Sequence, residues 1–408
     1  MKRRLALPIV LALAALLRPA AGAAQQSNLL TPAAASLQSQ AGWTVTPSLS
    51  YGGSWDDNVL VRGEGDETPA DFLNTVNPRV ALDFNGRRGQ VSANYDGAFM
   101  LYRDLDSLNS YDQRAWFYGR RLLSQHVALV VREQAASVPT TELAGFVGVP
   151  FTRTGSKLND LRVGVEAAFT KRTSMIANYN GQWVAFDQSQ PEASSLRDGH
   201  SHGASLSVKH LRTAQLALTA DYDLQHAITG SAGETFIIQN AWAGIEYKLT
   251  DLTRIVASGG LSRLRFTTSA QSATGPAWKV GLFRQIGTAS VQVLWSNSFV
   301  PAYGFGGTTQ NEEITGQFNL PIGRRFYSHS SVAWRSNDPV TVGPDALTVG
   351  VPLRSTWVQS SFGWMATRWA GIEMFYSGTH QTIDRPGGLT ERRRVGFQVI
   401  TTKPVRIR

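Results

Sequence analysis

The chain has 408 residues, contains no cysteine and carries a formal net charge of +9. The absence of cysteine excludes disulfide bonds and a lipid anchor through an N-terminal cysteine. The basic residues are spread along the sequence and form no single patch, so nucleic acid is not expected as a partner.

Residues 1–23 have the pattern of a cleaved secretory signal. Residues 2–4 are basic, residues 5–17 form an apolar core, and residues 21–23 are small, as a cleavage site requires. The core is shorter than the roughly 20 residues that a helix needs to cross a bilayer, which favours cleavage over retention as an anchor. Cleavage takes four positive charges from the formal +9 and leaves about +5. An exported chain without disulfides depends on backbone hydrogen bonds and packing, a requirement that closed barrels of the bacterial outer membrane meet.

Residues 24–41 are polar and rich in glutamine and alanine, which predicts a short periplasmic leader of low order. Beyond them polar and apolar residues alternate, and the clearest unit is residues 77–102. There Val80 and Leu82 belong to an apolar row, residues 86–89 reverse the chain, and the alternation then resumes. Alternation of period two on both sides of a glycine-flanked turn predicts a β-hairpin.

The same pattern recurs along the chain and predicts eighteen strands. They lie near residues 43–53, 76–86, 89–102, 111–121, 125–135, 158–170, 173–187, 200–210, 213–227, 235–249, 252–266, 276–285, 288–300, 310–320, 324–336, 353–366, 369–383 and 390–401. No apolar stretch of about 18 or more residues follows the signal, so no transmembrane helix is expected.

The connections between the predicted strands alternate strictly between two kinds. Short turns carry basic residues, such as Arg87 and Arg324, and longer connections such as residues 52–75 lie between them. This alternation is typical of an up-and-down antiparallel outer-membrane barrel with both termini in the periplasm. We therefore predict an all-β transmembrane barrel over residues 42–402, followed by a C-terminal tail at 403–408.

A repeat of about 40 residues between basic turns also fits a β-propeller. Propeller blades contain four short strands per repeat, whereas this chain shows two long ones. Many segments alternate for about ten residues or more, enough to cross an apolar band at a tilt, while strands of soluble proteins cluster near 5 or 6 residues. A membrane barrel is therefore the favoured interpretation.

The polar rows of such strands must face water, because Arg or Lys on the lipid face near the midplane costs about 2–4 kcal/mol. With roughly 18 strands the interior is too wide for side chains to fill, so it becomes an aqueous channel unless a loop plugs it. The predicted pore-lining residues are Arg79, Asp83, Asp96, Arg162, Glu166, Lys209, Asp221, Asp223, Glu246, Lys248, Glu313, Glu373, Arg392 and Arg394. Cross-strand pairing is an equally good interpretation of any one of them, and the two roles are compatible.

Tyrosines and tryptophans near predicted strand ends fit interfacial girdles, although aromatic residues are common in strands generally. They are Trp43, Tyr51, Trp55, Tyr102, Trp116, Tyr118, Trp183, Tyr247, Trp295, Tyr327, Trp364 and Trp369. The alternation is blurred by serines in segments 324–336 and 353–366, which fits either a surface facing a partner subunit or a bulge.

Three further motifs are candidates for sites of chemistry. Residues 199–203 match G-x-S-x-G, but they lack the strand, sharp turn and helix that make such a serine reactive. His200 and His202 offer two metal ligands without an evident third, so no metal site is predicted. The acidic residues between Asp56 and Asp71 fit a solvated loop better than a site for a divalent cation shared with lipopolysaccharide, because their spacing matches no calcium loop.

Residues 47–51 (PSLSY), residues 55–59 (WDDNV) and residues 76–78 (VNP) leading into residues 80–82 (VAL) carry a resemblance to a known family. They resemble the beta-barrel porin type 2 family and the outer-membrane barrels associated with exosortase (PEP-CTERM) and exopolysaccharide gene clusters. The resemblance implies a pore of about 18 strands, with polysaccharide passed outward in concert with periplasmic partners. The chain departs from the common barrel ending, because residues 402–408 continue to an arginine instead of closing on an aromatic residue.

The sequence thus predicts an outer-membrane pore, either a conduit for exopolysaccharide export or a porin-like channel, that is not an enzyme and uses no cofactor. Its expected partners are outer-membrane lipid, lipopolysaccharide and periplasmic polysaccharide-export components, and its oligomeric state is left open. The alternative is an outer-membrane enzyme or an adhesion scaffold that acts through its extracellular loops.

Overall fold

The computed structural model describes residues 41–141, 149, 151–187, 196–229, 234–267, 271–304, 307–342, 347–349, 352–383 and 388–407. The predicted signal at 1–23 and all but the last residue of the predicted leader lie outside these ranges. Within them the chain is almost entirely β-structure, with one short 3-10 helix, η2 (Asp106–Leu108). No helix in the described ranges is both long enough and apolar enough to span a membrane.

The strands follow one another along the whole described chain. They are β1 (Gly42–Asp56), β2 (Asp71–Asn85), β3 (Gly89–Tyr102), β4 (Ser110–Leu122), β5 (Val127–Val138), β6 (Ser156–Ala168), β7 (Thr173–Phe186), β8 (Gly199–Leu211), β9 (Leu216–Thr229), β10 (Glu234–Thr250), β11 (Thr253–Phe266), β12 (Ser272–Ile286), β13 (Ala289–Pro301), β14 (Thr308–Ile322), β15 (Phe326–Val342), β16 (Leu347–Val349), β17 (Leu353–Met365), β18 (Ala370–Ile383), β19 (Leu389–Thr402) and β20 (Val405–Ile407).

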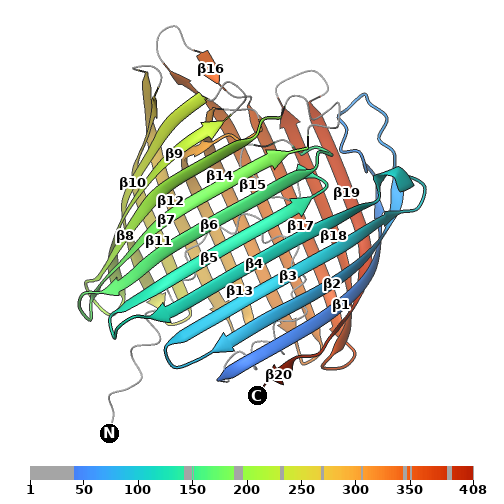
Figure 1. The fold of residues 1–408 in the computed structure, drawn as a ribbon, viewed down its shortest axis with the longest axis horizontal. Coiled ribbons are helices and arrows are strands. Elements are labelled where there is room, and N and C mark those ends of the chain that lie inside the picture. Colours follow the sequence, from blue (N-terminus) through green and yellow to red (C-terminus); the bar gives the residue numbers. More distant parts are fainter. Residues whose placement is uncertain are drawn as a thin grey trace.

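Eighteen of these strands form one closed antiparallel barrel (Figure 1). Each long strand pairs with the next one in the sequence, and β19 returns to pair with β1, from Ser48 opposite Thr402 to Asp56 opposite Arg394. The short strand β16 pairs with the end of β15 beyond the wall, and β20 pairs with the start of β1. The predicted all-β, up-and-down barrel of eighteen strands is therefore confirmed.

The two ends of the barrel differ in their connections. Short turns such as residues 86–88 and 323–325 join the strands at one end, and the longer connections lie at the other. The start of β1 and the end of β19 both lie at the short-turn end, where β20 is also found (Figure 1). We call these the short-turn end and the long-loop end of the barrel.

The C-terminal segment extends the barrel closure. After Thr402 the backbone N–H of Lys403 donates to the carbonyl of Pro47 at 3.3 Å, and β20 then continues the pairing with β1 as far as Ile407 opposite Trp43. Residues 403–408, expected as a tail, thus include a short strand that lengthens the seam. Because Pro lacks an N–H, the break between β19 and β20 at Pro404 has a local cause.

Each wall strand has an outward row of exposed apolar side chains and an inward row of polar ones. In β9, Leu218 and Tyr222 are 46% and 41% exposed on the outward row, whereas Asp221 and Asp223 belong to the inward row. The register carries this division from strand to strand, because directly paired residues share a face: Tyr222 faces Ala241 of β10 and Leu206 of β8. The predicted pore-lining residues of β6, β9 and β14, which are Arg162, Glu166, Asp221, Asp223 and Glu313, lie on the inward rows.

The strands with blurred alternation contain no bulge. β15 and β17 keep an uninterrupted register from Phe326 opposite Trp364 to Asn337 opposite Leu353. Ser328, Ser330 and Ser360 fall on the outward row, where the hydroxyls of Ser330 and Ser360 lie 2.9 Å apart, and Ser331 and Ser361 fall on the inward row. The bulge alternative for these segments is therefore wrong.

Four of the predicted girdle aromatics lie on the inward row. Tyr102, Trp116, Tyr118 and Tyr327 face the interior, since their cross-strand partners are inward residues such as Leu73 and Glu373. Strand-end position alone did not separate them from the outward aromatics. Trp43, Tyr51, Trp55, Trp183, Tyr247, Trp295 and Trp364 are exposed on the outward row.

Substitutions at neighbouring positions of β13 test the two faces. Val293 is exposed on the outward row, and Gln292 is on the inward row. We expect Val293→Arg to lower the free energy of unfolding in lipid vesicles by about 2–4 kcal/mol, because the guanidinium would enter hydrocarbon. Gln292→Arg is the matched control and should change it far less. Equal effects of the two substitutions in a urea titration would contradict the assignment of the faces.

Candidate functional site

The fourteen predicted pore-lining residues all lie on the inward rows of the barrel wall. Arg79 faces Asp96 across β2 and β3, and Asp83 faces Ser92 in the same pair of strands. The inward row of β9 contains Asp221 and Asp223, and the inward row of β10 contains Glu246 and Lys248. The remaining ones are Arg162, Glu166, Lys209, Glu313, Glu373, Arg392 and Arg394, from β6, β8, β14, β18 and β19.

Many inward charges form ion pairs across strands. Arg79 Nε lies 3.4 Å from Asp96, and Arg335 Nη2 lies 2.8 Å from Glu313. Glu246 receives two cations, with Lys209 Nζ at 2.6 Å and Arg254 Nη1 at 3.6 Å. The wall is therefore charged but locally balanced.

Several inward charged residues were missed by the sequence prediction. They are Asp71, Asp112, Arg114, Arg120, Arg132, Asp160, Arg254, Lys279 and Arg335. The signal that could have found several of them is parity, because Asp71 and Asp160 stand an even number of residues from an assigned inward residue of the same strand, and Arg114 and Arg335 face one across a pair. Arg120 reaches Glu166 of β6 at 3.0 Å.

A buried ion cluster lies at the long-loop end of the barrel seam. Arg392 of β19 donates from Nε and Nη2 to the carboxylate of Asp56 of β1, with the shortest contact at 2.5 Å, and both side chains are almost fully buried. Arg394 Nε lies 3.7 Å from the same carboxylate. Asn58 donates to the carbonyl of Glu391 at 2.8 Å, which adds a further tie between the first loop and β19. The cluster fixes the first long loop to the strand that closes the barrel.

Residues 151–155, which we call the strap, reach across the interior at this end. The N–H of Phe151 donates to Gln381 Oε1 of β18 at 2.6 Å, although the strap itself leads into β6. Arg153 donates to the hydroxyl of Tyr102 at 2.8 Å and to the carbonyl of Leu108 at 2.8 Å. Its guanidinium also lies over the Tyr102 ring, 4.9 Å from the centroid. The strap is thus hydrogen-bonded on two sides of the barrel.

Three buried apolar clusters occupy the same end of the barrel. The first cluster includes Tyr303, Val149 and Leu196, which come from three different connections between strands. The third cluster includes Val59 and Tyr102. Tyr303 donates its hydroxyl to Ser201 Oγ at 2.8 Å, and burial raises the pKa of this hydroxyl well above its ordinary value. It therefore stays protonated and keeps donating at physiological pH.

The second cluster shows that the wall itself bends inward. Phe299 of β13 packs with Phe236 and Leu264 of β10 and β11, and its N–H donates to Ser262 Oγ of β11 at 3.2 Å. β11 and β13 are separated in the wall by β12, whose pairing with β13 stops at Trp278 opposite Asn297. The end of β13 therefore leaves its place beside β12 and lies against the inner face of β11. Together with the strap, this narrows the long-loop end.

Inward aromatic rings lie farther down the wall. The rings of Trp116 and Tyr118 are nearly parallel, at 8°, with centroids 6.3 Å apart, and Arg132 lies over Tyr118 at 5.3 Å. Asn94 and Gln134 flank Trp116 on the neighbouring strands. This part of the wall combines flat apolar faces with hydrogen-bonding groups.

The G-x-S-x-G motif and the two histidines are separated by the alternation of β8. Ser201 is buried on the inward row, where it accepts from Tyr303 and from Gln225 Nε2. His200 and His202 point outward, and the ring of His226 lies 4.9 Å from that of His202. Among the described residues, no group of three His, Cys, Asp or Glu side chains is placed to hold a metal ion.

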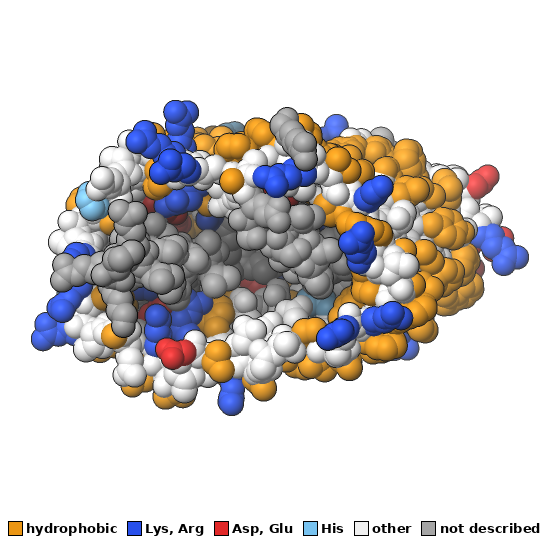
Figure 2. Space-filling model, turned by 90° about the horizontal axis from the view of Figure 1, so that it is seen from below, with side chains coloured by type: hydrophobic (Ala, Val, Ile, Leu, Met, Phe, Trp, Pro, Cys, Tyr) orange, Lys and Arg blue, Asp and Glu red, His pale blue; other side chains and the backbone are white. Residues whose placement is uncertain are grey.

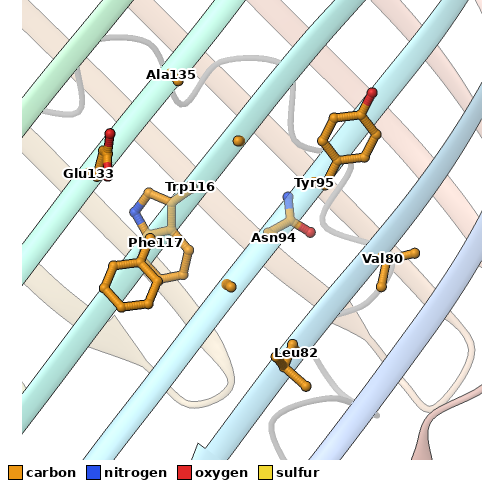
Figure 3. A pocket seen from close by; sticks show the side chains of 10 residues that line it. Val80, Leu82, Asn94, Tyr95, Trp116, Phe117, Glu133 and Ala135 are labelled. Carbon is orange, nitrogen blue, oxygen red and sulfur yellow. The ribbon is translucent and has the colours of Figure 1, made fainter.

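A shallow hollow of about 470 Å³ lies in the wall between β2 and β5 (Figure 3). Ala93, Ala115 and Ala135 form its floor on the outward row, and Tyr95 and Phe117 stand beside them. Glu133 is also outward and accepts from Asn159 at 3.0 Å. The hollow opens to the outside of the barrel and does not belong to the lumen.

Comparisons with known proteins assign no family. No family model matches the sequence, and no curated protein matches it. Among solved structures, it is similar to OccAB3 of Acinetobacter baumannii, with 10% identity over 89% of this chain and 99% of that chain and a TM-score of 0.44. It is also similar to OpdK of Pseudomonas aeruginosa, solved with vanillate (10% identity, 88% and 99% coverage, TM-score 0.44), and to the siderophore receptor PirA of Pseudomonas aeruginosa (9% identity, 89% and 80% coverage, TM-score 0.43). Likenesses this remote assign no substrate.

The ion cluster at the seam predicts unequal effects of two adjacent substitutions. Arg392→Gln leaves the buried Asp56 carboxylate poorly compensated, and loss of one partner of a buried pair typically costs about 3–5 kcal/mol. Arg393 is exposed and pairs with exposed Glu391 at 3.2 Å, so Arg393→Gln should leave the stability nearly unchanged. Denaturant midpoints in the same detergent check this. Similar midpoints for both variants would contradict a structural role of the cluster.

Proposed function

We propose that this protein is a channel of the bacterial outer membrane, inserted with its short turns and both termini in the periplasm and its long loops outside. The observation that supports this most strongly is the two-sided wall. Large apolar residues such as Leu218, Val293 and Phe397 are exposed outward all round the barrel. Exposed apolar surface on this scale is costly in water and is the surface that a bilayer covers.

The interior supports a conduit for water and solutes. A barrel of about eighteen strands is too wide for its own side chains to fill. Its inner wall carries ion pairs such as Arg120 with Glu166 and Lys209 with Glu246, which are stable next to water and would be costly against lipid. The fourteen inward charged residues predicted from the sequence act in this proposal as part of the channel lining.

For the cargo, we infer a polysaccharide exported outward, with a general porin-like channel as the broader form of the proposal. Sugar rings present flat C–H faces and many hydroxyls, and Trp116 and Tyr118 beside Asn94, Gln134 and Arg132 offer matching partners. The resemblance of residues 47–59 and 76–82 to exopolysaccharide-associated barrels points the same way. Outer-membrane lipid, lipopolysaccharide and periplasmic export components are the partners that this function requires.

Conductance of the refolded protein in planar bilayers is the direct test of the channel. We expect stable ion-conducting steps from barrels whose folding is confirmed by an altered electrophoretic mobility without heating. A folded barrel that carries no current, even after the long loops are trimmed, would contradict the channel and favour a scaffold acting through its loops. Unchanged polysaccharide secretion in a deletion strain would contradict the proposed polysaccharide cargo without contradicting the proposed channel.

The strap provides a second prediction about the channel. Arg153→Ala removes the hydrogen bonds to Tyr102 and Leu108. We expect a larger or noisier single-channel conductance, because residues 151–155 would no longer be held across the lumen. Arg103→Ala, which alters an exposed arginine at the same end, is the control and should leave the conductance unchanged. Identical traces from the two variants would show that the strap does not restrict the passage.

A further inference from the structure

The short turns of the barrel gather basic side chains at one mouth. Within the described turns, exposed cations occur in five of the eight connections. They are Arg87, Arg88, Lys171, Arg172, Arg212, Arg324, Arg325 and Arg368. Figure 2 shows basic side chains spaced around this mouth, on different sides of its central hollow. We call these eight residues the basic rim.

The basic rim has little to neutralise it. The same turns contain a single acidic residue, Asp251 between β10 and β11. No ion pair joins any of the eight cations to a carboxylate in the described parts of the chain, and Arg368 contacts the ring of Trp369 instead. Their charges are therefore available to solutes at the mouth.

The first long loop, at the opposite end of the barrel, has an excess of acidic residues. The first long loop carries Asp57, Glu64, Asp66 and Glu67 against Arg62. Between the two ends, the inward charges are largely paired, as in Arg335 with Glu313 and Arg79 with Asp96. A solute approaching along the barrel axis thus meets net positive charge mainly at the short-turn mouth.

The spacing of the short turns makes the fields of adjacent basic turns overlap. Neighbouring short turns are two strand spacings apart, or about 10 Å. This is close to the Debye length of about 10 Å at 0.1 M salt, so potentials overlap between the adjacent basic turns at residues 169–172 and 212–215 and between those at 323–325 and 366–369. At 1 M salt the Debye length falls to about 3 Å and the turns become electrically separate. A ring of one sign around a channel mouth raises the local concentration of counter-ions.

We propose that the basic rim makes this channel selective for anionic solutes and collects them at the short-turn mouth. The inference rests on the proposed channel function and adds the charge class of its cargo and the end at which that cargo enters. The recognised chemistry is the carboxylate, sulfate or phosphate group, which small anions and acidic polysaccharides share.

Reversal potentials across a salt gradient test the selectivity. We expect the full-length barrel to pass chloride in preference to potassium at 0.1 M KCl and to lose most of this preference at 1 M KCl. Replacing Arg87, Arg88, Arg324 and Arg325 by Glu should abolish the preference, because four positive charges are replaced by four negative ones and the eight rim positions then sum to zero. The matched control is Arg103→Glu with Arg393→Glu, two exposed arginines at the long-loop end, which should retain it.

A second arm distinguishes small anions from acidic polymers. In channels of known orientation, polygalacturonate added at the short-turn side should interrupt the current at lower concentration than neutral dextran of the same length. Interruption by polygalacturonate from that side identifies a polymer cargo, and chloride selectivity without it identifies small anions.

Other results would overturn the inference. A cation-selective native channel, or a selectivity unchanged in the four-arginine variant, would contradict the role of the basic rim while the channel itself stands. A folded barrel without current would instead contradict the proposed function. Heat-dependent mobility on gels verifies that each variant is folded.

Discussion

The structure depends on the cost of placing charge in hydrocarbon and exposing apolar surface to water. Each strand resolves this conflict by alternation, since successive side chains point to opposite faces of the sheet. Leu218 and Tyr222 then lie outside while Asp221 and Asp223 lie inside on one strand. Closure of β19 on β1 leaves no unpaired wall edge, which is what allows a sheet to stand in lipid.

Two further contacts stabilise the seam between β1 and β19. Arg392 and Asp56 join the first and last long strands of the wall by a buried ion pair, and β20 extends the same seam at the other end. The long-loop end is then narrowed from within by the strap and by the inward course of β13. The short-turn end keeps its hollow and its basic rim (Figure 2). The two ends therefore differ in the segments that lie inside the barrel and in the charge of their described connections.

Much of this architecture could be predicted from the sequence, because period-two alternation and turn chemistry are local signals. They located the eighteen strands and the inward rows. They did not separate Trp116 and Tyr118 from outward aromatics, since an aromatic near a strand end fits either face until its register is known. Contacts between distant segments, such as Phe151 with Gln381, leave no local pattern. The departure of β13 from β12 is a packing outcome of the same kind, because Phe299 and Leu264 are ordinary strand residues until the fold brings them together.

The absence of native cysteine makes one measurement especially direct. Single cysteines placed in turn at positions 218 to 224 of β9 can be exposed, in bilayers, to a thiol reagent that does not enter lipid. The account predicts labelling at 219, 221 and 223, on the inward row, and protection at 218, 220, 222 and 224. Labelling that ignores this alternation, or that favours the even positions, would contradict a water-filled barrel surrounded by lipid.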